Sequence, residues 1–409
     1  MLYNKSMYEL YPYFTNDGSV GLFSPDADDI YHSTYGALTE AYEKFILPSD
    51  FKKYFQKNNE IKILDICFGI GYNTKSFLNN FYENIYNESI GVDNVNYNDE
   101  LYSNNKKYKI FIKAVDTDKI LANLSPFFIT NKNNAKNSKL PFKQDKISKM
   151  LSGVTQQKYK LKKEIQILLL KNIFENIDFE TENILYNKKY LQYFDPSIMR
   201  LFKFYKSQVS NLPFILCLNR FLHNIYYKNI SMSHKSLSKA LKLIDFTFDL
   251  NIDDARKVLL NDNVKYNYVF LDAFTPTKCP CLWTLDFMKL LYSHLEAGGM
   301  ILTYSNSAQV RNAFLNAGFY VGKIYSESSK KFTGTVASNS RTMFEENNLI
   351  YELSEYDLGL MKTKAGIFYR DENFNLDNEA IINLHKLEVE KSKLISSSRF
   401  IKEYKKLDK

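Results

Sequence analysis

Apolar residues recur along this chain as short continuous runs and as helical repeats, and the short runs are the more informative. The first run, 61–66, is followed by Gly69 and Gly71. Ile61, Ile63, Leu64 and Ile66 suit a buried parallel strand, and glycine allows a tight turn and the close approach of a ligand. A helix is predicted over 73–80, with its N-terminal amides facing that ligand. The pattern predicts a strand, a glycine turn and a helix.

The remaining pattern places strands and helices on both sides of this unit. Thr15–Ser19 contains Asp-Gly, which marks a tight hairpin turn, and a helix is expected to follow and to end near Leu47. Gly298–Gly299 is expected to end a helix. Further strands are predicted over 88–93, 245–250, 266–271, 300–304, 319–325 and 333–337, and further helices over 159–176, 196–209, 216–227, 234–243, 283–295 and 306–316.

Alternation of strands and helices predicts an α/β fold with a Rossmann-like parallel sheet. The alternation stops between 94 and 242, where helical periodicity dominates. We therefore predict an N-terminal β/α extension over 1–50, a sheet domain made of 51–93 and 243–371, a mainly helical insertion over 94–242, and a charged C-terminal helix over 372–409.

Carboxylates at strand ends distinguish two kinds of nucleotide site. A dinucleotide fingerprint requires a third glycine where this chain has Thr74, so S-adenosylmethionine is favoured over NAD. Asp93 ends a predicted strand 22 residues after Gly71, which is the interval expected for an acid that binds both ribose hydroxyls. Asp254 is placed to accept from the adenine amine. Because ligands bind outside the carboxyl ends of parallel strands, Asp272 should converge there too, although a lone aspartate at a strand end is often a turn residue.

Composition narrows the class of protein further. The 409 residues carry a net charge of +8, which is compatible with a polyanionic partner and also with an ordinary lysine-rich surface. The four cysteines lack zinc-site spacing, and Cys279-Pro-Cys281 is too tight for a structural zinc site, so a reducing compartment is expected. The apolar runs are too short to cross a bilayer, and no signal sequence is recognised. We expect a cytoplasmic protein without a metal or membrane contact.

Several motifs together resemble those of the bacterial tRNA 5-aminomethyluridine methyltransferases of the MnmC/MnmD type. The resemblance spans about residues 10–93 and 245–371, and its specificity comes from the order of the motifs. They are Thr15–Ser19, Asp28–Ser33 with Gly36, Ala37 and Glu40, Phe68–Asn73, Leu271–Lys278 with Trp283 and Thr284, and Ala365–Asp371.

This resemblance implies a class I methyltransferase fold and methylation of 5-aminomethyl-2-thiouridine at the tRNA wobble position, with the tRNA anticodon region as partner. It implies roles for these residues: Phe68, Gly69, Gly71 and Asn73 at the methionine part of S-adenosyl-L-methionine, Asp93 at ribose, Asp254 near adenine, and Asp272 at the acceptor amine, with Tyr31 and His32 as second contacts. This sequence departs from the family at Cys67, where many members have glycine, and at Asp93, where many have glutamate. The insertion leaves the mode of tRNA docking open.

No flavin-binding glycine motif follows the sheet domain, so the stand-alone enzyme without FAD is expected, with another enzyme supplying the aminomethyl group. Two other functions stay open. One is an aminopropyltransferase of the spermidine synthase kind, which would need no basic surface. The other is a non-catalytic RNA-binding or scaffold protein. Phe274 and Trp283 could each stack a base or pack their loop.

Overall fold

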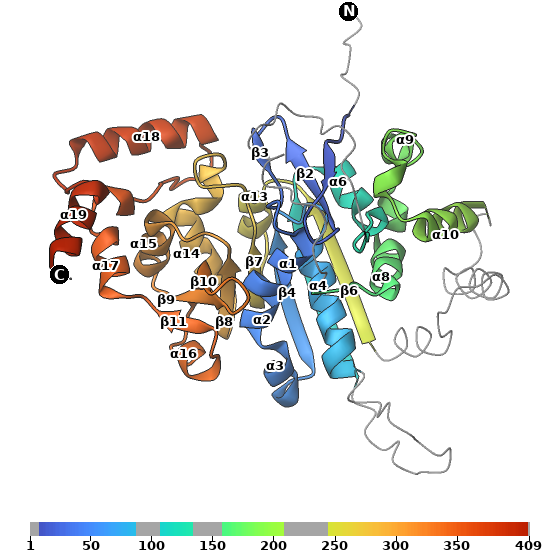
Figure 1. Ribbon diagram of the computed structural model, residues 1–409, viewed down its shortest axis with the longest axis horizontal. Helices are drawn as coiled ribbons and strands as arrows, with labels where there is room; N and C mark the ends of the chain where they lie inside the picture. The colour runs from blue at the N-terminus through green and yellow to red at the C-terminus, as the bar shows by residue number, and fades with distance from the viewer. Residues whose placement is uncertain (1–7, 87–106, 134–157, 208–243, 408–409) are drawn as a thin grey trace, which may run out of the picture. The chain divides into compact units, whose positions relative to one another are not determined.

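The computed structural model describes residues 8–86, 107–133, 158–207 and 244–407, which form two compact units (Figure 1). The first unit takes its residues from 1–41, 69–79 and 119–242, and the second from 42–68, 80–118 and 243–409. The predicted strand 88–93, including Asp93, lies outside the described residues, as do the predicted helices 216–227 and 234–243.

The second unit is built on an eight-stranded sheet with the order β11-β9-β10-β8-β7-β4-β5-β6. Strands β6, β5, β4, β7 and β8 are parallel, whereas β10 lies antiparallel between β8 and β9. This arrangement confirms the predicted α/β, Rossmann-like sheet. The strands are β4 (Glu60–Ile66), β5 (Tyr108–Asp116), β6 (Ile244–Ile252), β7 (Tyr266–Leu271), β8 (Leu295–Thr303), β9 (Tyr320–Ser326), β10 (Lys331–Ser338) and β11 (Ile350–Glu352).

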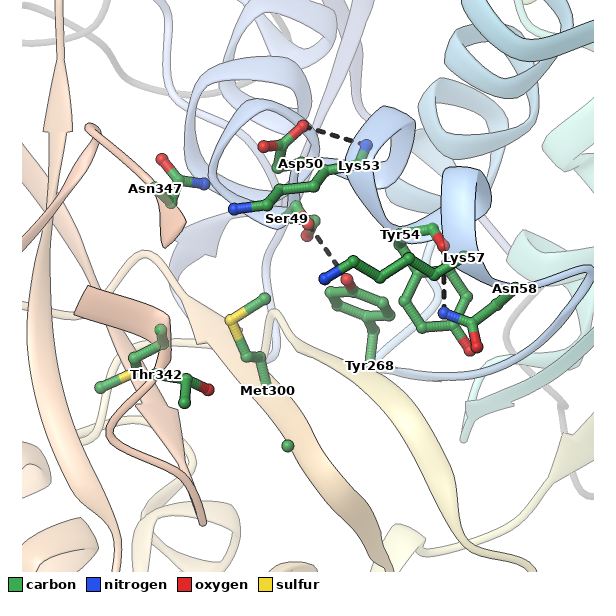
Figure 2. Close-up of a pocket in the computed structure, with 12 residues that line it drawn as sticks. Ser49, Asp50, Lys53, Tyr54, Lys57, Asn58, Tyr268, Met300, Thr342 and Asn347 are labelled. Atoms are coloured by element: carbon green, nitrogen blue, oxygen red, sulfur yellow. Dashed lines mark hydrogen bonds between the residues drawn. The ribbon is translucent and has the colours of Figure 1, made fainter. Parts of the chain in front are cut away.

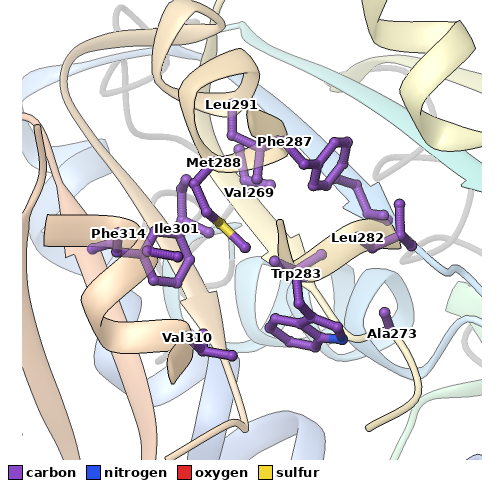
Figure 3. Packing of buried hydrophobic residues seen from close by; sticks show 14 of the residues in the cluster. Val269, Ala273, Leu282, Trp283, Phe287, Met288, Leu291, Ile301, Val310 and Phe314 are labelled. Carbon is purple, nitrogen blue, oxygen red and sulfur yellow. The ribbon is translucent and has the colours of Figure 1, made fainter. Parts of the chain in front are cut away.

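Alternate residues of β7 pack on opposite faces of the sheet, as the two-residue period of a strand requires. Val269 and Leu271 join the core formed with α13 (Ala255–Leu260), α14 (Leu285–Ser293) and α15 (Ala308–Asn316), in which Trp283 is fully buried (Figure 3). On the other face, the ring of Phe51 contacts those of Tyr268 and Phe270. The continuous apolar run of β7 thus reflects burial on both sides.

The remaining helices of this unit are short, apart from those at its C-terminal end. They comprise the π-helical turns Tyr42–Ile46 and Phe81–Tyr86, the 3-10 turns Pro280–Trp283 and Lys364–Gly366, α2 (Leu47–Ser49), α3 (Phe51–Lys57), α16 (Met343–Glu346), α17 (Glu355–Met361), α18 (Asn378–Lys391) and α19 (Ser397–Leu407). The tail expected as one charged helix is therefore two, α18 and α19. Phe400 of α19 packs against Tyr356 of α17.

Two further expectations differ from the structure. The range 94–242, predicted as mainly helical, contains β5, which pairs with β4 and β6 in the sheet. Gly298 and Gly299, expected to end a helix, lie inside β8, while α14 ends earlier, at Ser293. Gly298 has a φ of +74°, which glycine adopts without strain, and the pairing of β7 with β8 shifts just before Tyr268. The glycines therefore form an irregularity in a strand.

The first unit contains a three-stranded antiparallel sheet and several helices. The Asp17-Gly18 hairpin is confirmed, and the buried Asp17 carboxylate accepts hydrogen bonds from the amide of Ser19 (3.0 Å) and the amide of Thr39 (2.8 Å). Asp17 thereby joins the hairpin to the first helix. The elements are β1 (Pro12–Phe14), β2 (Val20–Ser24), β3 (Asp29–Ile30), α1 (Ala37–Ala41), α4 (Tyr72–Asn80, all but its last residue in this unit), α6 (Lys119–Leu124), α8 (Lys163–Ile173), α9 (Phe179–Leu185), α10 (Pro196–Ser207) and 3-10 turns at Ser125–Phe127, Phe174–Asn176 and Leu191–Tyr193.

Among the helices in the described part of the chain, none is both long and apolar enough to span a membrane.

Candidate functional site

The carboxyl ends of β4, β5 and β7 meet at one edge of the sheet in the second unit. Ile66, near the end of β4, lies opposite Val115 of β5 and Leu271 of β7. The residues that follow are Cys67, Asp116 and Asp272. The Asp272 amide donates to the Ile66 carbonyl (3.3 Å), and the Cys67 amide donates to the Val115 carbonyl (2.9 Å). Two carboxylates therefore flank the end of the central strand.

Both carboxylates affect the pKa of the Cys67 thiol. Burial is the main reason that its pKa is raised well above the ordinary value, and the negative charges of Asp116 and Asp272 raise it further. The Cys67 side chain is partly exposed at the end of the strand. Because its pKa is raised, the thiol stays protonated at neutral pH. The position that departs from the family pattern thus adds no charge between the two aspartates.

Asp116 has the place in the sheet that the sequence argument gave to Asp93. It is the last residue of β5, the strand next to β4 on the side away from β7. Asp93 lies outside the described residues. The segment 108–116 alternates apolar residues with Lys109 and Lys113 before it ends in aspartate. This alternation is the sequence signal that could have identified the strand. Asp116 is a candidate site residue that the sequence analysis did not single out.

Asp254 follows β6 and caps α13. Its carboxylate accepts from the Arg256 amide (2.9 Å), from Arg256 Nε (3.1 Å to each oxygen) and from an Arg256 terminal nitrogen (2.7 Å). Burial tends to raise the pKa of Asp254, but the hydrogen bonds from Arg256 outweigh it and lower the pKa. These bonds occupy most of the acceptor capacity of one carboxylate, so the geometry indicates a structural cap. Its adenine contact stays a prediction.

The motif 365–371 ends in a buried ionic cluster. Asp371 is fully buried and accepts from one terminal nitrogen of Arg256 (2.6 Å), whose other terminal nitrogen bonds Asp254. The Asp371 amide donates to Asp286 (2.8 Å), whose carboxylate also accepts from Arg370 Nε (3.1 Å). This cluster ties the segment after α17 to α13 and α14. The motif therefore has a structural role in this unit.

The loop after β7 is fixed from two sides. The indole nitrogen of Trp283 donates to the Phe274 carbonyl (2.8 Å), and the Tyr304 hydroxyl donates to the Ala273 carbonyl (2.8 Å). Trp283 is fully buried in the core shown in Figure 3. Its ring therefore packs the loop, and neither face of the ring is accessible to a base. Phe274 is partly exposed.

The segment 67–73 has the backbone conformation expected of a ligand-binding turn. Gly69 and Gly71 have φ values of +54° and +73°, and Cys67 has +63°, a left-handed conformation that strains a residue with a side chain. Phe68 is buried, with its ring centroid 5.6 Å from that of Phe248. Within the second unit, the end of β4 beside a neighbouring strand that ends in Asp116 is the position at which α/β folds bind a nucleotide cofactor.

In the first unit, the predicted residues lie around the start of α4. The rings of His32 and Tyr72 meet edge to face, 5.1 Å apart, and the Tyr72 hydroxyl accepts from the Val20 amide (2.9 Å). The backbone carbonyl of His32 accepts a hydrogen bond from Tyr13. Asn73 is buried, and Tyr31 is partly exposed on the segment that follows β3. His32 therefore lies against the helix that follows the glycine turn.

Lys75 of α4 is a feature that sequence reasoning missed. Its side chain is fully buried, its Nζ donates to the Ser125 carbonyl (3.0 Å), and it lies 4.7 Å from the centroid of the Tyr72 ring. Burial lowers the pKa of Lys75 from 10.5 to about 7. Its neighbour Ser125 donates to the Ile70 carbonyl of the glycine turn (2.8 Å).

A cavity of about 150 Å³ lies elsewhere in the second unit (Figure 2). Figure 2 shows the side chains of Lys53 and Lys57 extending across it, above Tyr268 and Met300. Tyr268 lies near the start of β7, whereas Asp272 follows the end of that strand. None of the residues predicted for the site lines this cavity, so it is distinct from the edge that carries Asp116 and Asp272.

Comparisons with known proteins support a methyltransferase. Residues 219–340 match a family model described as S-adenosyl-L-methionine-dependent methyltransferase. An uncharacterised protein of Methanocaldococcus jannaschii is 24% identical over 389 residues, which cover 95% of this chain and 75% of that protein. The bifunctional tRNA 5-methylaminomethyl-2-thiouridine biosynthesis protein MnmC of Delftia acidovorans is 32% identical over 75 residues, which cover 18% of this chain and 12% of that protein.

The fold also has a counterpart among solved structures. The crystal structure of MnmC2 from Aquifex aeolicus matches with a TM-score of 0.55 and 22% identity, covering 95% of this chain and 88% of that one. At this identity the match concerns the fold, and it agrees with the predicted class I methyltransferase architecture. The chain thus matches an S-adenosyl-L-methionine-dependent methyltransferase family model over 219–340, is locally similar to MnmC in sequence, and resembles MnmC2 in fold.

Proposed function

We propose that the protein transfers a methyl group from S-adenosyl-L-methionine to the primary amine of 5-aminomethyluridine or its 2-thio form at the tRNA wobble position, giving 5-methylaminomethyluridine. The observation that carries the proposal is the carboxyl edge of the sheet, where Asp272 and Asp116 flank the end of β4. The local likeness to MnmC and the net charge of +8 support a tRNA substrate. The partners proposed are the tRNA anticodon region and the enzyme that supplies the aminomethyl group.

The cofactor supplies an electrophilic methyl group when bound. We assign its methionine part to the segment Phe68, Gly69, Gly71 and Asn73, as the motif resemblance implies. Asp116 is the candidate for the ribose hydroxyls, because a carboxylate accepts two hydrogen bonds at once and β5 lies next to β4. Asp93 and Asp254 remain predictions for ribose and adenine.

The acceptor amine needs a free lone pair, so it must be neutral when it reacts. We propose that the Asp272 carboxylate accepts a hydrogen bond from this amine, which orients the lone pair and helps a proton leave. Asp272 is partly exposed on a loop whose carbonyls are fixed by Trp283 and Tyr304, so its position is well defined. Positioning supplies most of the acceleration in such reactions. Tyr31 and His32 are proposed as second contacts from the sequence alone.

The ribose assignment predicts different outcomes for two aspartates. Asp116→Asn is expected to weaken binding of S-adenosyl-L-methionine roughly 10- to 100-fold, because hydrogen bonds to a charged acceptor contribute about 1.5–3 kcal/mol. Asp93→Asn is the matched variant. Isothermal titration calorimetry of both measures the dissociation constant directly. A loss of affinity in Asp93→Asn alone would return the ribose contact to the residue that the sequence analysis named.

The substrate is tested with purified protein and methyl-labelled S-adenosyl-L-methionine. The expected acceptor is tRNA that carries free 5-aminomethyluridines, with 5-methylaminomethyluridine identified by mass spectrometry of its nucleosides. Transfer should weaken steeply with added salt, because phosphate contacts dominate tRNA binding. Putrescine with decarboxylated cofactor tests the aminopropyltransferase. Spermidine formed from putrescine without methylation of tRNA, or no binding of either cofactor, would reject the proposal in favour of that enzyme or of a non-catalytic protein.

A further inference from the structure

Two cysteines form a close pair on the loop that follows Asp272. The Sγ atoms of Cys279 and Cys281 lie 3.6 Å apart, and both residues are partly exposed. A disulfide needs a separation of about 2.0 Å, so the sulfurs must approach by roughly 1.6 Å. Within the described residues, no group of three His, Cys, Asp or Glu side chains is arranged to hold a metal ion. The pair is therefore placed for the chemistry of two thiols.

Backbone hydrogen bonds hold this pair in place. The Cys279 amide donates to the Thr275 carbonyl (3.0 Å), and the Cys281 amide donates to the Asn378 side chain at the start of α18 (3.3 Å). Pro280 between them fixes one backbone dihedral angle. The loop thus keeps the sulfurs together without a covalent bond.

The surroundings shift the pKa values of the two thiols in opposite directions. The two sulfurs lie within hydrogen-bonding distance, and a hydrogen bond from the Cys279 thiol, with the guanidinium of Arg256, lowers the pKa of Cys281 against the opposing effect of burial. The same hydrogen bond and burial raise the pKa of Cys279. The guanidinium of Arg256 therefore favours the thiolate form of Cys281, which makes Cys281 the better nucleophile of the pair.

We propose that Cys279 and Cys281 form a thiol–disulfide exchange site that reacts with low-molecular-weight disulfides, such as oxidised glutathione, and closes to a Cys279–Cys281 disulfide. The Cys281 thiolate attacks one sulfur of the disulfide and forms a mixed disulfide, releasing one thiolate. That thiolate takes the proton of Cys279. Cys279 then attacks the Cys281 sulfur and expels the second thiolate, so the protein loses two electrons and one proton and the small disulfide is reduced.

Closure would change the edge of the sheet that carries the proposed site. It removes the negative charge of Cys281 beside Arg256, which holds both Asp254 and the buried Asp371. It also draws in the end of the loop that begins at Asp272. Exchange itself does not depend on the tRNA substrate, but its effect on turnover rests on the proposed function.

The test treats the reduced full-length protein with oxidised glutathione and maps its peptides by mass spectrometry. The expected product is a peptide with both cysteines that has lost two hydrogen atoms. Cys279→Ser should accumulate one glutathione on Cys281, because the second attack is missing. Cys281→Ser should react with oxidised glutathione at least about tenfold more slowly than the wild type. Turnover of the wild type should fall roughly tenfold on oxidation and return with dithiothreitol.

Two matched variants keep the result specific. Cys67→Ser and Cys217→Ser should each close the Cys279–Cys281 disulfide at the wild-type rate. A disulfide that includes Cys67, or glutathione that stays on wild-type Cys281 without closure, would overturn the proposal. Because the peptide map needs no methyl acceptor, these outcomes are separate from failure of the proposed methyl transfer.

Discussion

Asp272→Asn is expected to lower kcat for methyl transfer by about 10²–10⁴-fold, the range typical of a lost acid–base contact. The asparagine side chain has the size of the aspartate side chain but carries no negative charge. It is therefore a poorer acceptor for the substrate amine and its departing proton. The Asp272 backbone amide still donates to Ile66, which keeps the loop in place. The dissociation constant of S-adenosyl-L-methionine should therefore change little.

Single-turnover kinetics with methyl-labelled cofactor measure this effect apart from product release. Asp253→Asn is the matched control, because Asp253 also follows a parallel strand but pairs on the surface with Lys257 (3.8 Å). Its kcat should equal that of the wild type. Wild-type turnover in Asp272→Asn, at saturating cofactor and tRNA, would remove Asp272 from the proposed mechanism.

Lys75 gives the second large expected effect, on stability. Its pKa falls from 10.5 to about 7 because burial removes the ammonium group from water. Below pH 7 both the folded and unfolded chains bind the proton, and folding bears the whole penalty of burying the charge. Between pH 7 and 10.5 the unfolded chain binds more proton than the folded one, so the free energy of unfolding rises with pH. Above 10.5 the penalty is absent.

Lys75→Met is therefore expected to stabilise the protein at pH 7 by a few kcal/mol and to lose that advantage as the pH rises. The difference in unfolding free energy between variant and wild type should fall by about 2 kcal/mol from pH 7.5 to 9.5. At high pH the variant lacks the hydrogen bond to the Ser125 carbonyl, which limits its gain. Urea unfolding at several pH values measures the difference.

Lys257→Met is the control for Lys75→Met, because the side chain of Lys257 is 66% exposed and stays in water in the folded chain. Its stability relative to the wild type should not depend on pH over the same range. A pH-independent difference for Lys75→Met as well would show that Lys75 is not the group that titrates.

The parts of the fold that sequence predicted well are the strands buried on both faces. The strands β4 and β7 read as largely apolar runs, and Gly69 follows the first within three residues while Asp272 follows the second directly. Parallel strands align their carboxyl ends, so the nearness of Asp272 to the end of β4 followed from the pattern alone.

The parts that sequence did not predict depend on contacts between distant segments. Lys75 reads as the polar face of a helix, and only packing shows that its amine is enclosed by Tyr72 and Ser125. The hydrogen bond from Arg256 to Asp371, 115 residues later, was not apparent either, whereas the adenine contact of Asp254 stays a prediction. Gly298 reads as a helix stop, yet α14 had already ended and the glycine serves a strand.

The strand β5 was not predicted because charged residues interrupt its apolar pattern. These charged residues contribute to its pairing with β6. Lys113 lies opposite Asp249 of β6, with 3.5 Å between the charged groups, and Lys109 lies opposite Asp245. A slip of β6 by one residue would separate both pairs and place apolar side chains opposite lysine. The ion pair between Lys113 and Asp249 therefore favours the observed register of β6 against β5, the strand that ends in Asp116.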